Sequence, residues 1–93
     1  MMKLSDDEIT RELGSLAGWR REGDAIARDY ELTDFVAALG LIAQIGALAE
    51  RADHHPTLTN TYNRVGIKLS THDVGGITAN DFALARAIEV RVT

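Results

Sequence analysis

The chain has 93 residues, of which 45% are hydrophobic and 26% are charged. This balance predicts one folded domain over residues 1–93, because disordered chains carry less apolar surface. Ten Lys and Arg against fourteen Asp and Glu give a formal net charge of −4, so we expect no nucleic-acid partner. The absence of cysteine excludes disulfides and thiolate chemistry.

The longest apolar stretch, residues 32–49, contains Asp34 and two glycines and is short for a bilayer span. The first eight residues hold one lysine and three acids, unlike a secretory signal. We therefore expect a cytoplasmic protein with no membrane partner. Because so small a domain buries only about 60 to 70% of its unfolded surface, we also expect a homodimer or homotetramer.

Residues 5–18 are predicted to form the first helix. Ser5 and Glu8 have the spacing of a capping box, in which each side chain satisfies a free backbone N–H at the start of the helix. An apolar stripe follows at helical spacing: Ile9, Leu13 and Leu16.

Residues 19–32 alternate in the manner of a β-hairpin, with Gly23 and Asp24 at the turn. Ile26, Tyr30 and Leu32 share one face with a charged residue, Arg28. That charge indicates either an edge strand or a partly wet sheet face, and the pattern alone leaves both open.

Residues 33–51 are predicted to form the longest helix, with Thr33 as N-cap. Pro56 and the residues just before it cannot continue a helix. The expected core face is broad: Phe35, Val36, Leu39, Ile42, Ala43, Ile45 and Ala49. A helix apolar over so much of its circumference is covered on two sides, either by the sheet and another helix or by a second subunit.

Residues 62–71 alternate as an antiparallel strand with one face on the core. After the Gly75-Gly76 turn, Thr78 and Asp81 have the spacing of a helix cap. The last helix then runs to the C-terminus. This order of helix, hairpin, helix, strand and helix predicts an α+β fold, with helices on one face of an antiparallel sheet.

All three histidines, His54, His55 and His72, fall within 19 residues of one another. Histidine transfers protons near neutral pH because its unperturbed pKa is about 6.5, so the cluster indicates proton transfer or metal binding. Zinc could draw on Asp53 or Asp81 as further ligands. Adjacent histidines do not have the spacing of known zinc motifs, so we expect no metal.

Two of the histidines, His54 and His72, also have a purely structural interpretation. His54 follows the long helix directly and could satisfy carbonyl groups at its C-terminus. His72 ends the long strand and could bond a local hydroxyl group or Asp73.

Taken together, three segments resemble the signature of the pterin-4a-carbinolamine dehydratases, and the resemblance covers nearly the whole chain. The first segment is Glu50 followed by Asp53-His54-His55-Pro56. The second is the alternating strand that begins Tyr62-Asn63 and ends Thr71-His72, and the third runs from Gly76 to Asp81.

The resemblance implies a four-stranded antiparallel sheet with three helices on one face. It also implies dehydration of 4a-hydroxytetrahydropterin to quinonoid dihydropterin, which recycles the cofactor of aromatic amino acid hydroxylases. His54, His55 and His72 would supply the acid and the base, and the sequence leaves open which does which. Pterin-binding or orienting residues would be Glu50, Asp53, Pro56 and Asp81. No metal or cofactor is implied.

Two positions depart from the family pattern. Leu58-Thr59 stands where a Trp-Phe pair is common, which removes an aromatic wall, and Asn80 stands where arginine is frequent. Two other functions stay open. One is a non-catalytic relative that binds another protein as a dimerisation or assembly cofactor. The other is pterin handling in molybdopterin metabolism.

Overall fold

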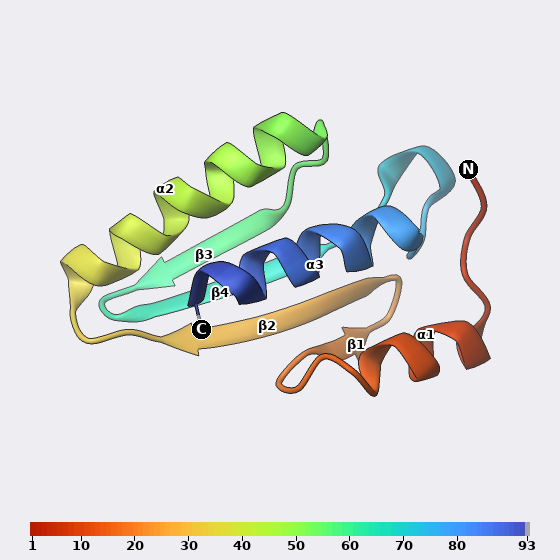
Figure 1. Ribbon diagram of the computed structural model, residues 1–93, viewed down its shortest axis with the longest axis horizontal. Coiled ribbons are helices and arrows are strands. Elements are labelled where there is room, and N and C mark those ends of the chain that lie inside the picture. The colour runs from red at the N-terminus through yellow and green to blue at the C-terminus, as the bar shows by residue number, and fades with distance from the viewer. Residues whose placement is uncertain (93) are drawn as a thin grey trace.

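The computed structural model describes residues 1–92, which form three α-helices, four β-strands and one 3-10 turn. Figure 1 shows α2 and α3 lying side by side across the sheet, with α1 beside β1. The elements in chain order are α1 (Asp6–Leu13), β1 (Arg20–Glu22), β2 (Ala25–Glu31), α2 (Phe35–Ala52), β3 (Thr57–Thr61), β4 (Arg64–Leu69), η1 (His72–Val74) and α3 (Ala79–Val92).

The sheet is antiparallel throughout, with strand order β1-β2-β4-β3. Alternate residues of the two central strands are buried beneath the helices: Ile26, Tyr30, Val65, Ile67 and Leu69. Residues between them, such as Asp29 and Lys68, point to the opposite face. The expected α+β fold with helices on one side of an antiparallel sheet is therefore confirmed.

The capping box of α1 is confirmed, since the Ser5 hydroxyl accepts from the Glu8 N–H and the Glu8 carboxylate accepts from the Ser5 N–H. The helix is shorter than expected and ends at Leu13, with Gly14 as its C-cap. Leu16 is still buried, although it lies in the turn that follows. The apolar spacing thus predicted which side chains enter the core better than where the helix ends.

Arg28 lies on an interior strand, β2, so the edge-strand interpretation was wrong and the partly wet face is correct. Its Nη1 donates to the Ala17 carbonyl at 2.7 Å, and its guanidinium lies 4.5 Å from the centre of the Tyr30 ring. The guanidinium also packs on Gly18, where a Cβ atom would lie only 1.0 Å from Nη1. Gly18, with φ of 87°, is therefore needed both for its backbone and for the space above it.

Two predictions for α2 need correction. The N-cap is Asp34 rather than Thr33, because the Asp34 carboxylate accepts from the Ala37 N–H at 2.8 Å. The buried stripe is Ala38, Leu41, Ile45 and Ala49. Of the other residues predicted to face the core, Ile42 is half-buried and four are exposed: Phe35, Val36, Leu39 and Ala43. Apolar side chains surround most of this helix, so hydrophobic periodicity could not identify which face packs on the sheet.

The strand β3 was not predicted from the pattern of the residues, although the family resemblance implied a fourth strand. It pairs with β4 along its whole length, through a turn at Tyr62 and Asn63. Tyr62 has φ of 50° and belongs to this turn rather than to the strand. The sheet with four strands and three helices that the resemblance implied is confirmed.

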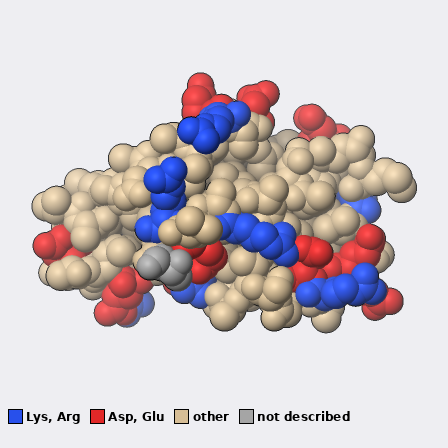
Figure 2. Space-filling model, in the orientation of Figure 1, with Lys and Arg blue, Asp and Glu red and all other residues tan. Residues whose placement is uncertain are grey.

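The 18 residues of α2, with a mean hydropathy of 1.4, are long and apolar enough to span a membrane by length and composition. In this structure α2 packs one stripe, Ala38, Leu41, Ile45 and Ala49, into the core, and 22% of the helix is buried. The exposed part of α2 carries little charge, because its first charged residue is Glu50, and the surface there is largely uncharged in Figure 2.

Candidate active site

His54 reaches the core because of how α2 ends. Asp53 is the C-cap and adopts the left-handed conformation, with φ of 50° and ψ of 45°. The backbone N–H of His54 then donates to the Ala49 carbonyl at 3.0 Å, which turns the chain back along the helix. The imidazole is left 11% exposed, and it does not cap the carbonyl groups of the helix.

The partner of His54 is Asp81, in the first turn of α3, with 2.5 Å between Nε2 and Oδ1. Asp81 is 0% exposed. Its other carboxylate oxygen, Oδ2, accepts from the Thr71 hydroxyl at 2.9 Å and from the Thr78 N–H at 2.8 Å. A buried carboxylate is costly unless it is paired and hydrogen-bonded, and Asp81 meets both conditions.

His55, the next residue, lies in a different environment. Its Nε2 is 2.7 Å from Oε1 of Glu50, and the two side chains are 60% and 80% exposed. Each adjacent histidine therefore has one carboxylate partner, the first inside the domain and the second at its surface.

His72 begins the 3-10 turn η1 and is exposed. Its backbone lies next to Thr71, which donates to Asp81, so the Thr-His segment and the His-His-Pro segment both lead to the same carboxylate. Within residues 1–92 no hydrogen bond or ion pair joins the three imidazoles directly, and none joins the His72 ring to a hydroxyl group or to Asp73.

A pocket of about 310 Å³ opens beside His54, between the C-terminal half of α2 and the N-terminal half of α3. Apart from the imidazole, its lining is polar at Arg51 and Asn80 and otherwise consists of alanine and leucine side chains. His55 and His72 are not among its lining residues within the described chain. His54 is therefore the predicted site residue that borders this pocket.

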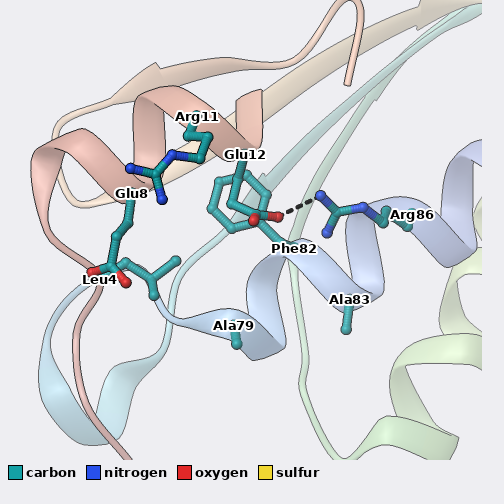
Figure 3. Close-up of a pocket in the computed structure, with 8 residues that line it drawn as sticks. All are labelled: Leu4, Glu8, Arg11, Glu12, Ala79, Phe82, Ala83 and Arg86. Atoms are coloured by element: carbon teal, nitrogen blue, oxygen red, sulfur yellow. Dashed lines mark hydrogen bonds and ion pairs between the residues drawn. The ribbon is translucent and has the colours of Figure 1, made fainter. Parts of the chain in front are cut away.

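A second pocket, of about 340 Å³, lies between α1 and α3 (Figure 3). Phe82 forms its floor, and Glu8, Arg11, Glu12 and Arg86 surround it. Arg86 is already paired with Glu12, and Glu8 is engaged in the capping box. None of the seven predicted site residues lines this pocket, so we do not assign the chemistry to it.

Other predicted residues have positions that fit supporting roles. Asp53 is exposed and acts through its backbone, and Pro56 leads the chain from the two histidines into β3. Leu58 is packed against the core, while the next residue, Thr59, faces the open side of the sheet beside Gly66. The family's Trp-Phe pair would thus place its two rings on opposite faces here.

Sequence analysis missed Thr71 as a partner of Asp81. A signal was present, because Thr71 continues the alternation of Val65, Ile67 and Leu69 and is buried at 6% exposure. A polar side chain on the core-facing side of a strand needs a hydrogen-bond partner, and Thr71 has two, Asp81 and Thr78. No group of three or more His, Asp or Glu side chains that could hold a metal ion is present in the part of the chain described.

Comparison with known proteins assigns the chain to a family. The family model for pterin 4 alpha carbinolamine dehydratase matches residues 2–90. A protein of Thermomicrobium roseum is 44% identical over 88 residues, which cover 95% of each chain. Another from Chloroflexus aggregans is 46% identical over 90 residues, or 96% of each chain. Both are provisionally named as pterin-4-alpha-carbinolamine dehydratases.

Solved structures give the same result. A transcriptional coactivator/pterin dehydratase from Brucella melitensis has a TM-score of 0.92 and 37% identity, and the match covers 96% of this chain and 97% of that one. A pterin dehydratase-like protein identified as a RuBisCO assembly factor of the alpha-carboxysome shares the fold, with a TM-score of 0.68 at 17% identity. With the family model matching nearly its full length, this chain belongs to the pterin-4a-carbinolamine dehydratase family.

Proposed function

We propose that this protein dehydrates 4a-hydroxytetrahydropterin to quinonoid dihydropterin and water, and that it does so in the cytoplasm, recycling the cofactor of aromatic amino acid hydroxylases. In this reaction the C4a–O bond breaks and its electron pair leaves with the hydroxyl group, which takes up a proton. A ring nitrogen loses a proton, and the electrons of that N–H bond form the new C=N bond. The oxidation state does not change, so the step requires proton transfer alone.

The observation that carries the proposal is the His54–Asp81 pair beside a pocket between α2 and α3, in a chain of this family. An imidazole held by a buried carboxylate can take a proton and give it back, which is what a dehydration requires. The pocket of about 310 Å³ is at the lower end of the sizes that hold small molecules.

We assign His55 and His72 as the other groups that exchange protons with the pterin. Glu50 orients His55, as Asp81 orients His54. Asp53 and Pro56 shape the turn that carries both adjacent histidines. Both side chains are exposed and neither lines the pocket beside His54, so the support for this assignment is the family motif to which both residues belong.

Replacing His54 or His72 with alanine tests the proposal. We expect turnover of chemically generated 4a-hydroxytetrahydropterin, followed by absorbance, to fall at least about tenfold, because a positioned acid or base supplies about 10² to 10⁴-fold. Arg64→Ala, on the open face of the sheet, is the matched control and should keep the wild-type rate. Wild-type rates in folded His54→Ala protein would contradict the role given to that residue.

We also propose that the protein is a homodimer or homotetramer that associates through α2. Three large apolar side chains near the start of this helix are exposed: Phe35 at 46%, Val36 at 76% and Leu39 at 46%. A second copy of the chain would bury them. The same surface supports the second candidate function, a non-catalytic relative that binds another protein there.

Light scattering on the double variant Val36→Lys, Leu39→Lys tests the association. The wild type should be an oligomer at micromolar concentration and the variant a folded monomer of one chain's mass. A monomeric wild type would contradict self-association. A monomer that lacks dehydratase activity and captures one stoichiometric protein partner would favour the second candidate function.

A further inference from the structure

Two buried threonines, Thr71 and Thr78, lie behind the carboxylate that pairs with His54. Thr71 is the residue before η1 and Thr78 the residue before α3, and they are 6% and 0% exposed. Their hydroxyl oxygens are 2.8 Å apart. Both side chains are buried, and their hydroxyl groups lead to Asp81, so we look for their role in the contacts to that carboxylate.

The directions of the hydrogen bonds follow from counting protons. A hydroxyl group has one proton to donate, and Thr71 lies 2.9 Å from Asp81 Oδ2, which can only accept when the carboxylate is ionised. Thr71 therefore donates to Asp81, and Thr78 must donate to Thr71. The Thr78 oxygen in turn accepts from the Asn80 N–H at 3.2 Å.

Every proton in this chain of bonds points toward Asp81. Oδ2 accepts from the Thr71 hydroxyl and also from the Thr78 N–H, at 2.8 Å, so two donors converge on this one oxygen. In the part of the chain described, Oδ1 has one neighbour with a proton to share, Nε2 of His54. A carboxylate oxygen without a proton can only accept, so Nε2 is the donor in this contact.

We propose that Thr71 and Thr78 are positioning residues that hold Asp81 as an acceptor and thereby fix His54 in its Nε2–H tautomer. Nδ1 is then the ring atom that takes the proton from, or returns it to, the pterin. The tautomer assignment stands on the hydrogen bonds alone, and its catalytic meaning rests on the proposed dehydratase function.

Nitrogen-15 NMR of the histidine side chains in the ligand-free protein tests the tautomer without reference to activity. At a pH where the ring is neutral, His54 should show a protonated Nε2 and an unprotonated Nδ1. The resonances are assigned by their loss in His54→Gln. A neutral His54 that is protonated mainly on Nδ1 would overturn the proposal.

The threonines are tested with Thr71→Val, which keeps the shape and removes the hydroxyl group, and Thr71→Ser, which restores it. Thr61→Val, at an exposed position of β3, is the matched control. We expect Thr71→Val to lower kcat about tenfold, which is about 1.4 kcal/mol at the barrier, with KM little changed. In the NMR spectrum it should populate the other tautomer, while Thr71→Ser and Thr61→Val should behave as wild type.

The outcomes separate this proposal from the proposed function. If the wild-type protein has no dehydratase activity but His54 is in the Nε2–H form, the proposed function is contradicted and the tautomer assignment is supported. If Thr71→Val folds and matches wild type in both kcat and tautomer, Thr71 is not a positioning residue. Should Thr71→Val not fold, Thr71→Ser must still hold the wild-type tautomer, and a changed tautomer there counts against the proposal.

Discussion

Two adjacent histidines, each paired with a carboxylate, end up in opposite settings in this protein. His54 and Asp81 form a buried pair that Thr71 and Thr78 support from behind, whereas His55 and Glu50 form a pair at the surface. An exposed ion pair gains little because water screens it, while a buried carboxylate that loses its partner is left without compensation. A histidine–carboxylate pair therefore affects the stability of this protein mainly where the fold excludes water from it.

The largest expected effect comes from breaking the buried pair. Asp81→Asn removes the charge that holds His54 and places an N–H₂ group against one of its neighbours, the Thr71 hydroxyl, the Thr78 N–H or the His54 ring. We expect the free energy of unfolding to fall by about 3 kcal/mol in a urea titration. A loss below 1 kcal/mol would mean that the carboxylate is not held as described.

A second, half-buried network around Glu89 offers an intermediate case with no histidine. Glu89 of α3 accepts from Trp19 Nε1 at 2.8 Å and from the Tyr30 hydroxyl, and it joins α3 to β2. Tyr30→Phe removes one of these bonds, so we expect a loss of about 1 kcal/mol in the free energy of unfolding. Dehydratase turnover should not change, because none of these residues is among those assigned to the site. A large loss of turnover in folded protein would mean that the site extends to this side of α3.

The hydrogen bond between Tyr30 and Glu89 also predicts that the free energy of unfolding falls at alkaline pH. Burial and the neighbouring Glu89 carboxylate raise the pKa of Tyr30 above its ordinary value of 10.0. Above pH 10.0 the tyrosine ionises in the unfolded chain but stays protonated in the folded protein. The contribution of Tyr30 to the free energy of unfolding is therefore complete below pH 10.0 and declines as the pH rises above that value. Urea midpoints between pH 9 and 11 should fall less steeply for Tyr30→Phe than for wild type. Parallel curves would contradict this assignment.

The smallest expected effect is at the exposed pair. Glu50→Gln should change the free energy of unfolding by less than about 0.5 kcal/mol, because both side chains are mostly in water. A urea titration run beside that of Asp81→Asn measures the contrast directly. A loss as large as that of Asp81→Asn would mean that the surface pair is not screened by water.

The sequence was informative wherever a local pattern decides the structure. The Ser5–Glu8 capping box, the alternation of Val65, Ile67 and Leu69, and the Thr78–Asp81 cap each involve neighbours along the chain, and each is present. Patterns that many arrangements could satisfy were less informative. In α2, apolar residues on nearly every side hid the fact that Leu41 and not Leu39 enters the core.

The sequence motif predicts which residues are candidates for the site but not their burial or their hydrogen-bond partners. The segment from residue 53 to 56 does not distinguish His54 from His55, because the burial of His54 depends on a partner 27 residues away that only the fold supplies. The strand β3 escaped prediction because Leu58 is its single apolar residue. Thr71 was overlooked because a threonine at the end of a strand is more often exposed than bound to a buried carboxylate.

The most direct test of the central claim is the turnover of 4a-hydroxytetrahydropterin by Asp81→Asn and by Glu50→Gln, measured side by side in protein shown to be folded. If the buried pair governs proton transfer, Asp81→Asn should be at least about tenfold slower than Glu50→Gln. Equal rates in the two variants would contradict the account.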